Sequence, residues 1–147
     1  MKTRFGKSMV LSVIAVIGAV GGMASADAEE VVCHYTYGGE TRQLSTVPVD
    51  SAYAVKAIEV GSYFRLRIVF RNRPADLAAI KVYSYADRDD GPVLVHQATY
   101  PYPPVAGKNA AYGFSGLQAV YEPVRDGEMQ YWCEWKPVQA ARSRRAS

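Results

Sequence analysis

Alternation of apolar and polar residues with a period of two is the feature of this sequence that most constrains its fold. The clearest run, residues 63–71, places four apolar side chains on one face and three arginines on the other. The apolar set is Phe64, Leu66, Ile68 and Phe70, and the arginines are Arg65, Arg67 and Arg71. This pattern predicts a strand with one buried face. The arginine row could contact anions, although such a row is more typical of the solvent side of a sheet.

Seven further runs show weaker alternation and indicate additional strands. They cover residues 31–37, 41–47, 53–60, 80–86, 93–100, 117–123 and 128–136. The runs are separated by turn-forming residues, namely Gly38-Gly39, Gly61-Ser62, Asn72-Arg73-Pro74, Asp90-Gly91 and Asp126-Gly127. We therefore expect an all-β fold, a single antiparallel β-sandwich of about seven or eight strands. Residues 75–79 are the one expected helical turn.

Residues 1–26 have the layout of a secretory signal peptide. Lys2, Arg4 and Lys7 form a basic start, an apolar run follows over residues 9–20, and small residues end at Ala26. We expect cleavage after Ala26 and no membrane span in the mature chain. Residues 27–137 then form the sandwich domain, and residues 138–147 a disordered basic tail.

The leader fits a bacterial export route. Nothing marks a wall or membrane anchor, and the sequence contains no Asn-x-Ser/Thr sequon. We expect the protein to be periplasmic, with secretion as the alternative.

Export bears on the two cysteines of the chain, Cys33 and Cys133. Thiols in an oxidising compartment tend to pair, whereas a redox or metal pair would show the Cys-x-x-Cys spacing that is absent here. We therefore expect a Cys33–Cys133 disulfide that ties the first strand to the last. It would close a loop of about 100 residues, for which the chain-entropy model predicts about 4 to 5 kcal/mol of stabilisation as an upper figure.

Tyr131 precedes Cys133 by two positions, and this spacing resembles the tyrosine-before-second-cysteine pattern of immunoglobulin domains. The resemblance implies an immunoglobulin-like or related sandwich. Other parts of the pattern differ, because no tryptophan lies between Cys33 and Tyr131 and the two cysteines are too far apart for the usual bridge between sheets. The resemblance therefore bears on architecture alone, and no specific family is recognised.

The charge balance argues against a nucleic-acid interface. The chain has 17 Lys and Arg against 14 Asp and Glu, and the leader holds three of the basic residues and none of the acidic ones. Arg142, Arg144 and Arg145 stand close to the C-terminus, so the expected domain is slightly acidic. A basic face for DNA or RNA is not expected.

The Asp126-Gly127 turn predicts one set of neighbouring side chains. As a two-residue turn it places Val120 opposite Cys133 and Tyr121 opposite Trp132. The face assigned to the core carries Val120, Met129, Tyr131, Cys133 and Trp135, and the other face carries Tyr121, Gln130, Trp132 and Glu134.

The Asp90-Gly91 turn, treated in the same way, predicts a tyrosine-rich face. It places Tyr85 opposite His96 and Tyr83 opposite Ala98, with Lys81 and Tyr100 at the far end of the hairpin.

Residues 101–116 form the longest stretch without a strand pattern. Long loops on rigid scaffolds often carry binding residues. The alternative is a crossover between the two sheets with Tyr112 and Phe114 packed into the core.

The candidate catalytic residues do not form a known catalytic pattern. Ser115 lies in Gly-Phe-Ser-Gly, which lacks the spacing of the Gly-x-Ser-x-Gly elbow. Cys33 and His34 are adjacent in a strand and point to opposite faces. Glu122 and Glu134 fall on opposite faces of their predicted hairpin. We predict no catalytic residue, and the chain is more typical of a binding protein than of an enzyme.

Metal binding has little support in the sequence. The acidic turn 87–91 could offer carboxylates to calcium but lacks the glutamate that a calcium loop requires. His34 and His96 are the only histidines, and the spacing of a blue-copper site is absent. We predict no metal and no cofactor, and leave open whether the acidic turn binds a cation.

Tyrosine is the one unusual residue in the composition, with 11 copies against 4 phenylalanines and 2 tryptophans. Tyrosine suits protein interfaces and ligand stacking, and it also suits ordinary strands. The candidate ligand-binding residues are Tyr83, Tyr85, His96, Tyr100, Tyr121 and Trp132. We expect an exported non-catalytic binding or accessory domain that uses this tyrosine-rich face or an open strand edge to hold a protein partner or an extracytoplasmic ligand. The alternative is a small periplasmic metal carrier or enzyme in which His34, His96, Asp87, Asp89 and Glu134 converge.

Overall fold

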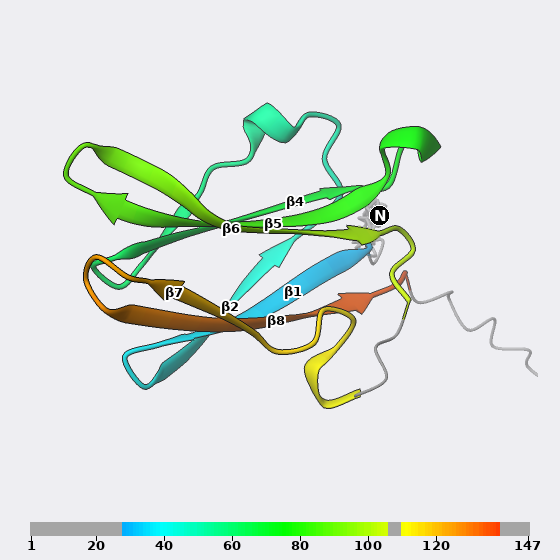
Figure 1. Ribbon diagram of the computed structural model, residues 1–147. Helices are drawn as coiled ribbons and strands as arrows, with labels where there is room; N and C mark the ends of the chain where they lie inside the picture. The colour runs from blue at the N-terminus through cyan, green and yellow to red at the C-terminus, as the bar shows by residue number, and fades with distance from the viewer. Residues whose placement is uncertain (1–27, 106–109, 139–147) are drawn as a thin grey trace, which may run out of the picture.

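Two antiparallel β-sheets of four strands each make up the described part of the chain, which contains almost no helix (Figure 1). The structure is a computed structural model and describes residues 28–105 and 110–138. The strand orders are β2-β1-β8-β7 and β3-β4-β5-β6. The strands are β1 (Glu30–Tyr37), β2 (Glu40–Thr46), β3 (Ile58–Val60), β4 (Phe64–Arg71), β5 (Ala79–Arg88), β6 (Gly91–Pro101), β7 (Gln118–Glu122) and β8 (Gly127–Lys136). The predicted all-β, sandwich-like architecture is confirmed.

The predicted signal peptide, residues 1–26, lies outside the described residues, as does the predicted tail beyond Val138. Among the residues that are described, no helix is long and apolar enough to cross a membrane.

One core forms where the two sheets face each other. The four apolar side chains that alternate along β4 are buried, and the three arginines of the opposite face are only half-buried. From the other sheet, Val31, Cys33, Tyr131 and Cys133 join the same cluster. The period-two pattern of the sequence therefore separates core from surface as predicted.

The Cys33–Cys133 disulfide joins β1 and β8 at the centre of the first sheet, as predicted. The two cysteines are direct partners in the strand register, and their Cα atoms lie 4.0 Å apart. So short a spacing is typical of an antiparallel pair that exchanges no backbone hydrogen bonds. The backbone N–H and C=O of Cys133 therefore point away from β1. The bridge lies within one sheet, whereas the bridge of immunoglobulin domains joins two sheets.

The segment before β7 satisfies these two backbone groups. The N–H of Cys133 donates to Ser115 Oγ at 2.7 Å, and its carbonyl accepts from the N–H of Phe114 at 3.0 Å. Gly113 has φ of 55° and lies so close to β8 that a Cβ there would sit 2.1 Å from the Cys133 carbonyl oxygen. Residues 113–115 therefore close the part of β8 that β7 is too short to cover. This is the predicted crossover, but only Phe114 packs against the core; Tyr112, also expected there, is 36% exposed.

Two local predictions need correction. The expected strand 53–60 is reduced to β3, because a 3-10 turn, η1 (Ala52–Ala54), takes its first residues out of the sheet. Arg67 holds this turn by donating to the carbonyls of Ala52 and Val55. The expected helical turn at 75–79 is present as the shorter 3-10 turn η2 (Ala75–Leu77).

The predicted register of the β7–β8 hairpin is wrong. Tyr121 lies opposite Glu128, not Trp132, because the loop is longer than two residues and Glu122 pairs with Gly127. The Glu122 carboxylate accepts the N–H groups of Val124 and Arg125 and so stabilises the longer turn. The shift is an even number of residues, so the predicted core face is retained.

The predicted register of the β5–β6 hairpin is also wrong. The turn lies one residue earlier, so that Tyr85 is opposite Leu94, and a β-bulge then brings Ser84 opposite His96. Beyond the bulge, the pairing differs from the predicted one by a single residue, and such an odd shift moves side chains to the other face of the sheet. Tyr83 and Tyr85 therefore do not share a face with His96 and Tyr100.

The disulfide predicts a large stability change. Replacing both Cys33 and Cys133 with alanine should lower the free energy of unfolding by up to about 4 to 5 kcal/mol, because the loop of about 100 residues is no longer closed in the unfolded chain. Urea denaturation of the oxidised protein and of the double variant measures this difference. An unchanged unfolding midpoint after complete reduction of the wild type would contradict the prediction.

Ser115 has a structural role that can be tested separately. Ser115→Ala leaves the buried N–H of Cys133 without its acceptor, which should cost about 1 to 3 kcal/mol of unfolding free energy. The matched control is Ser45→Ala, at an exposed position on β2, which should cost little. Equal unfolding midpoints for the two variants would show that the Ser115 contact is unimportant.

Candidate functional site

The six candidate ligand-binding residues lie in three separate places. Tyr83 and Tyr85 are on the outer face of the second sheet, His96 and Tyr100 point between the sheets, and Tyr121 and Trp132 are on the outer face of the first sheet. The structure therefore does not bring them into a single tyrosine-rich face. Each location has its own contacts.

On the outer face of the second sheet, the tyrosines lie beside the arginine row of β4. Tyr83 is the register partner of Arg67, whose guanidinium carbon lies 5.2 Å from the centre of the Tyr83 ring. Tyr85 is opposite Arg65, which pairs with Asp87 at 3.0 Å. The arginine row is thus partly used in contacts within the fold.

Between the sheets, His96 belongs to a neutral polar cluster. Its Nε2 is 2.8 Å from the hydroxyl of Tyr131. Burial lowers the pKa of His96 and raises the pKa of Tyr131. Burial also raises the pKa of Tyr100, against hydrogen bonds with Tyr131 and Ser115 that lower it. All these groups are therefore uncharged at neutral pH, and the cluster fixes β6 to the core of the sandwich.

On the outer face of the first sheet, Trp132 stacks on His34 rather than on Tyr121. The ring centres of Trp132 and His34 are 3.8 Å apart, and the rings are nearly parallel. His34 Nε2 lies 3.1 Å from a carboxylate oxygen of Glu134, and Tyr112 meets the Trp132 ring edge-on. Sequence reasoning missed this group. The cysteine pair was the available signal, because Cys33 opposite Cys133 places His34 opposite Trp132.

The residues of the alternative metal or catalytic site are dispersed. His34 and Glu134 pair on one outer face, while His96 bonds Tyr131 in the interior. Asp87 and Asp89 each pair with an arginine at the tips of the hairpins. In the described residues, no three His, Cys, Asp or Glu side chains gather closely enough to hold a metal ion.

Buried Glu122 links the tips of the β5–β6 and β7–β8 hairpins. It pairs with Arg88 at 2.8 Å and accepts the backbone N–H groups of Val124 and Arg125. Burial alone would raise the pKa of Glu122, but the hydrogen bonds from Arg88, Arg125 and Val124 outweigh it and lower the pKa below its usual value. The carboxylate is therefore charged in the folded protein at neutral pH.

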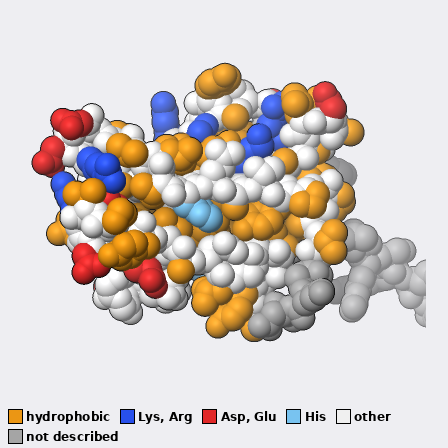
Figure 2. Space-filling model, in the orientation of Figure 1, with side chains coloured by type: hydrophobic (Ala, Val, Ile, Leu, Met, Phe, Trp, Pro, Cys, Tyr) orange, Lys and Arg blue, Asp and Glu red, His pale blue; other side chains and the backbone are white. Residues whose placement is uncertain are grey.

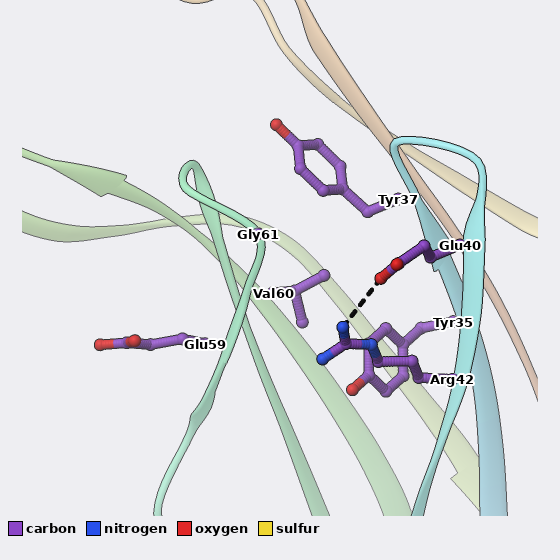
Figure 3. Close-up of a pocket in the computed structure, with 7 residues that line it drawn as sticks. All are labelled: Tyr35, Tyr37, Glu40, Arg42, Glu59, Val60 and Gly61. Carbon is purple, nitrogen blue, oxygen red and sulfur yellow. Dashed lines mark hydrogen bonds and ion pairs between the residues drawn. The ribbon is translucent and has the colours of Figure 1, made fainter.

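A small hollow opens at the edge formed by β1, β2 and β3 (Figure 3). Its volume is about 130 Å³. Arg42 pairs with Glu40 at 2.8 Å within it, while Glu59 points away from the other labelled side chains (Figure 3). A side chain at Gly61 would collide with the Tyr37 ring. The charges of Arg42 and Glu40 therefore already pair with each other rather than with a ligand.

The edge strand β6 is the most distinctive surface feature. It is the longest of the four edge strands and carries no Asp, Glu, Lys or Arg, whereas β2, β3 and β7 each contain a charged residue. Val93 and Leu94 near its start are 41% and 47% exposed. β6 and β7 form the two sheet edges on the same side of the molecule (Figure 1), and hydrophobic side chains are spread over that side (Figure 2).

Comparisons with protein-family models, with curated proteins and with solved structures found no match for this chain. The functional argument therefore depends on the residues and their geometry.

The lowered pKa of Glu122 predicts acid destabilisation. A carboxylate with a lowered pKa stabilises the fold above its unfolded pKa, near 4.5, and loses this contribution as the pH falls through the lower folded value. Glu122→Gln should therefore melt below the wild type at neutral pH, and the difference should shrink in acid. Thermal unfolding measured from about pH 7 to about pH 3 tests this.

The control for this experiment is Glu128→Gln, at an exposed position on the neighbouring strand. Its melting temperature should stay close to that of the wild type at each pH. A constant gap between Glu122→Gln and the wild type across the range would contradict the role assigned to the Glu122 carboxylate.

Proposed function

We propose that this chain is an exported, non-catalytic binding domain of immunoglobulin-like or related architecture. It recognises an extended segment of a protein partner, which adds as a further strand at the edge of β6. The Cys33–Cys133 disulfide supports export, because such bonds persist in oxidising compartments. The single observation that carries the binding proposal is the long, uncharged edge of β6.

An edge strand presents unpaired backbone N–H and C=O groups to any chain that can lie beside it. Natural proteins usually block such edges with short strands, charged side chains, proline or a bulge. β2 and β3 carry exposed charged residues, and β3 and β7 are short; the one charged residue of β7, Glu122, is buried. β6 relies on Pro92 and Pro101 near its ends and on one bulge, which leaves most of its length available for pairing.

The chemistry of β6 defines the partner segment. Val93 and Leu94 are exposed and point to opposite faces of the sheet. A partner strand beside them would bury apolar side chains on both faces while its backbone pairs with β6. We infer a partner segment that is extended, uncharged and apolar at the positions beside Val93 and Leu94.

Anchoring of β6 favours this use. The His96–Tyr131 hydrogen bond and the packing of Tyr100 against Phe114 fix the strand from the inside. A rigid edge loses little conformational entropy on binding, which increases affinity. The alternative of a metal or catalytic site around His96 stays a prediction that no contact in the described residues favours.

The proposal is tested with peptides selected from a random extended library against the purified protein. A bound peptide should protect backbone amides of β6 from hydrogen exchange. Val93→Lys should weaken peptide binding by about tenfold or more, because a charge on the edge must be desolvated. Val47→Lys, at a comparably exposed valine beyond the end of β2, should bind as the wild type does.

Protection of β2 or β7 amides instead of β6, or equal affinity of Val93→Lys and Val47→Lys, would overturn the proposal. Sedimentation of the free protein distinguishes a second copy from a partner peptide. A dimer that Val93→Lys dissociates would assign the edge to self-association rather than to a partner.

A further inference from the structure

A second candidate site lies on the outer face of the β3-β4-β5-β6 sheet, away from the β6 edge. A hollow of about 250 Å³ has Val69, Arg71, Lys81 and Tyr83 as its floor. The turns η1, at Ala52, and η2, around Leu77, form its walls. Figure 1 places these two turns at the top of the view, where Figure 2 shows Lys and Arg side chains between hydrophobic ones.

The walls of this hollow are held in place by contacts with the sheet. Arg67 donates to the carbonyls of Ala52 and Val55 and so fixes η1 above β4. Val69 lies on this outer face, yet it is only 2% exposed. The hollow is therefore a formed feature of the fold rather than an open sheet surface.

Arg71 is unlike the other arginines of the described residues. Six of them make an ion pair or a hydrogen bond: Arg42, Arg65, Arg67, Arg73, Arg88 and Arg125. The Arg71 guanidinium makes neither with another described residue. Its Nε is buried without a hydrogen-bond partner, as are those of Arg65 and Arg88, but each of these two arginines pairs with a carboxylate through a terminal nitrogen. A buried donor without an acceptor lowers the stability of the fold. An acceptor from a bound ligand would remove this penalty at Arg71.

Lys81 adds a second positive charge to the same floor. It is the register partner of Val69, and Ala79 is that of Arg71, so Lys81 and Arg71 are diagonal neighbours on adjacent strands. Diagonal neighbours on one face lie roughly 7 to 8 Å apart, within reach of long side chains. Two like charges this close repel each other, and an anion between them would relieve the repulsion.

We propose that this hollow binds a small organic monocarboxylate. The carboxylate contacts Arg71 and Lys81, and the apolar body of the ligand packs on Leu77 and the ring of Tyr83. Arginine binds a carboxylate through two parallel hydrogen bonds, which gives the head group a defined orientation.

The lining sets the charge and the size of the ligand. Asp76 also lines the hollow, so the net charge of the lining is a single positive charge, which favours a monoanion over a dianion. Cavities of about 150 Å³ hold a benzene molecule. The observed volume of about 250 Å³ therefore accommodates one ring with its carboxylate.

Titration of the isotopically labelled protein with sodium benzoate tests the proposal by NMR. Benzoate should bind with a dissociation constant on the order of 1 mM, as expected for so small a ligand, and should shift the amides of residues 69–83. Benzyl alcohol, which has the same ring without the charge, should bind at least about tenfold more weakly.

Variants identify the groups responsible. Arg71→Gln should weaken benzoate binding by about tenfold or more, and Lys81→Gln by several-fold. Asp76→Asn should strengthen it, because a repelling carboxylate is removed. The matched control is Arg73→Gln, which removes an arginine that pairs with Asp50 outside the hollow and should leave the affinity unchanged.

Three results would overturn the proposal: no shift with benzoate at tens of millimolar, equal binding of benzyl alcohol, or unchanged affinity in both Arg71→Gln and Lys81→Gln. None of these variants lies on β6, so failure here leaves the peptide experiment on the β6 edge unaffected.

Discussion

The register of β1 against β8, closed by the Cys33–Cys133 disulfide, is the constraint on which much of this structure depends. It aims the backbone groups of Cys133 away from β1, so another segment must satisfy them. The crossover before β7 does so through Ser115 and the N–H of Phe114, and this brings the crossover against the first sheet. The same register stacks His34 on Trp132 outside, while the cysteines remain in the core.

Most of the charged side chains near the two sheets have a hydrogen-bond or ion-pair partner within the chain. Glu122 is buried, yet Arg88 and two backbone N–H groups keep it ionised and join two hairpin tips. Arg67 donates hydrogen bonds to the carbonyls of Ala52 and Val55 and so stabilises the position of η1. Two features differ from this pattern: the guanidinium of Arg71 pairs with no described residue, and the edge of β6 carries no charge. We therefore infer that both are available to bind other molecules.

The two surfaces differ in the chemistry they favour. The edge of β6 offers backbone hydrogen bonds and apolar side chains, which suits an extended polypeptide. The hollow on the outer face of the same sheet offers charge and a ring-sized apolar lining, which suits a small acid. Because β5 contributes to the floor of the hollow and pairs with β6, both surfaces belong to one sheet.

Alternation along the chain was sufficient to predict most of the strands and the core face of β4, because a period of two encodes which side chains are buried. The disulfide followed from the presence of two cysteines in a chain expected to be exported. It could not determine which strands are neighbours. Each predicted turn was off by one or two positions, and the bulge beside Ser84 moved His96 away from Tyr83 and Tyr85. Register depends on turn length and on cross-strand contacts, which arise only when the strands meet. The hollow at Arg71 likewise required two distant turns to close over one sheet, so only the tertiary structure could define it.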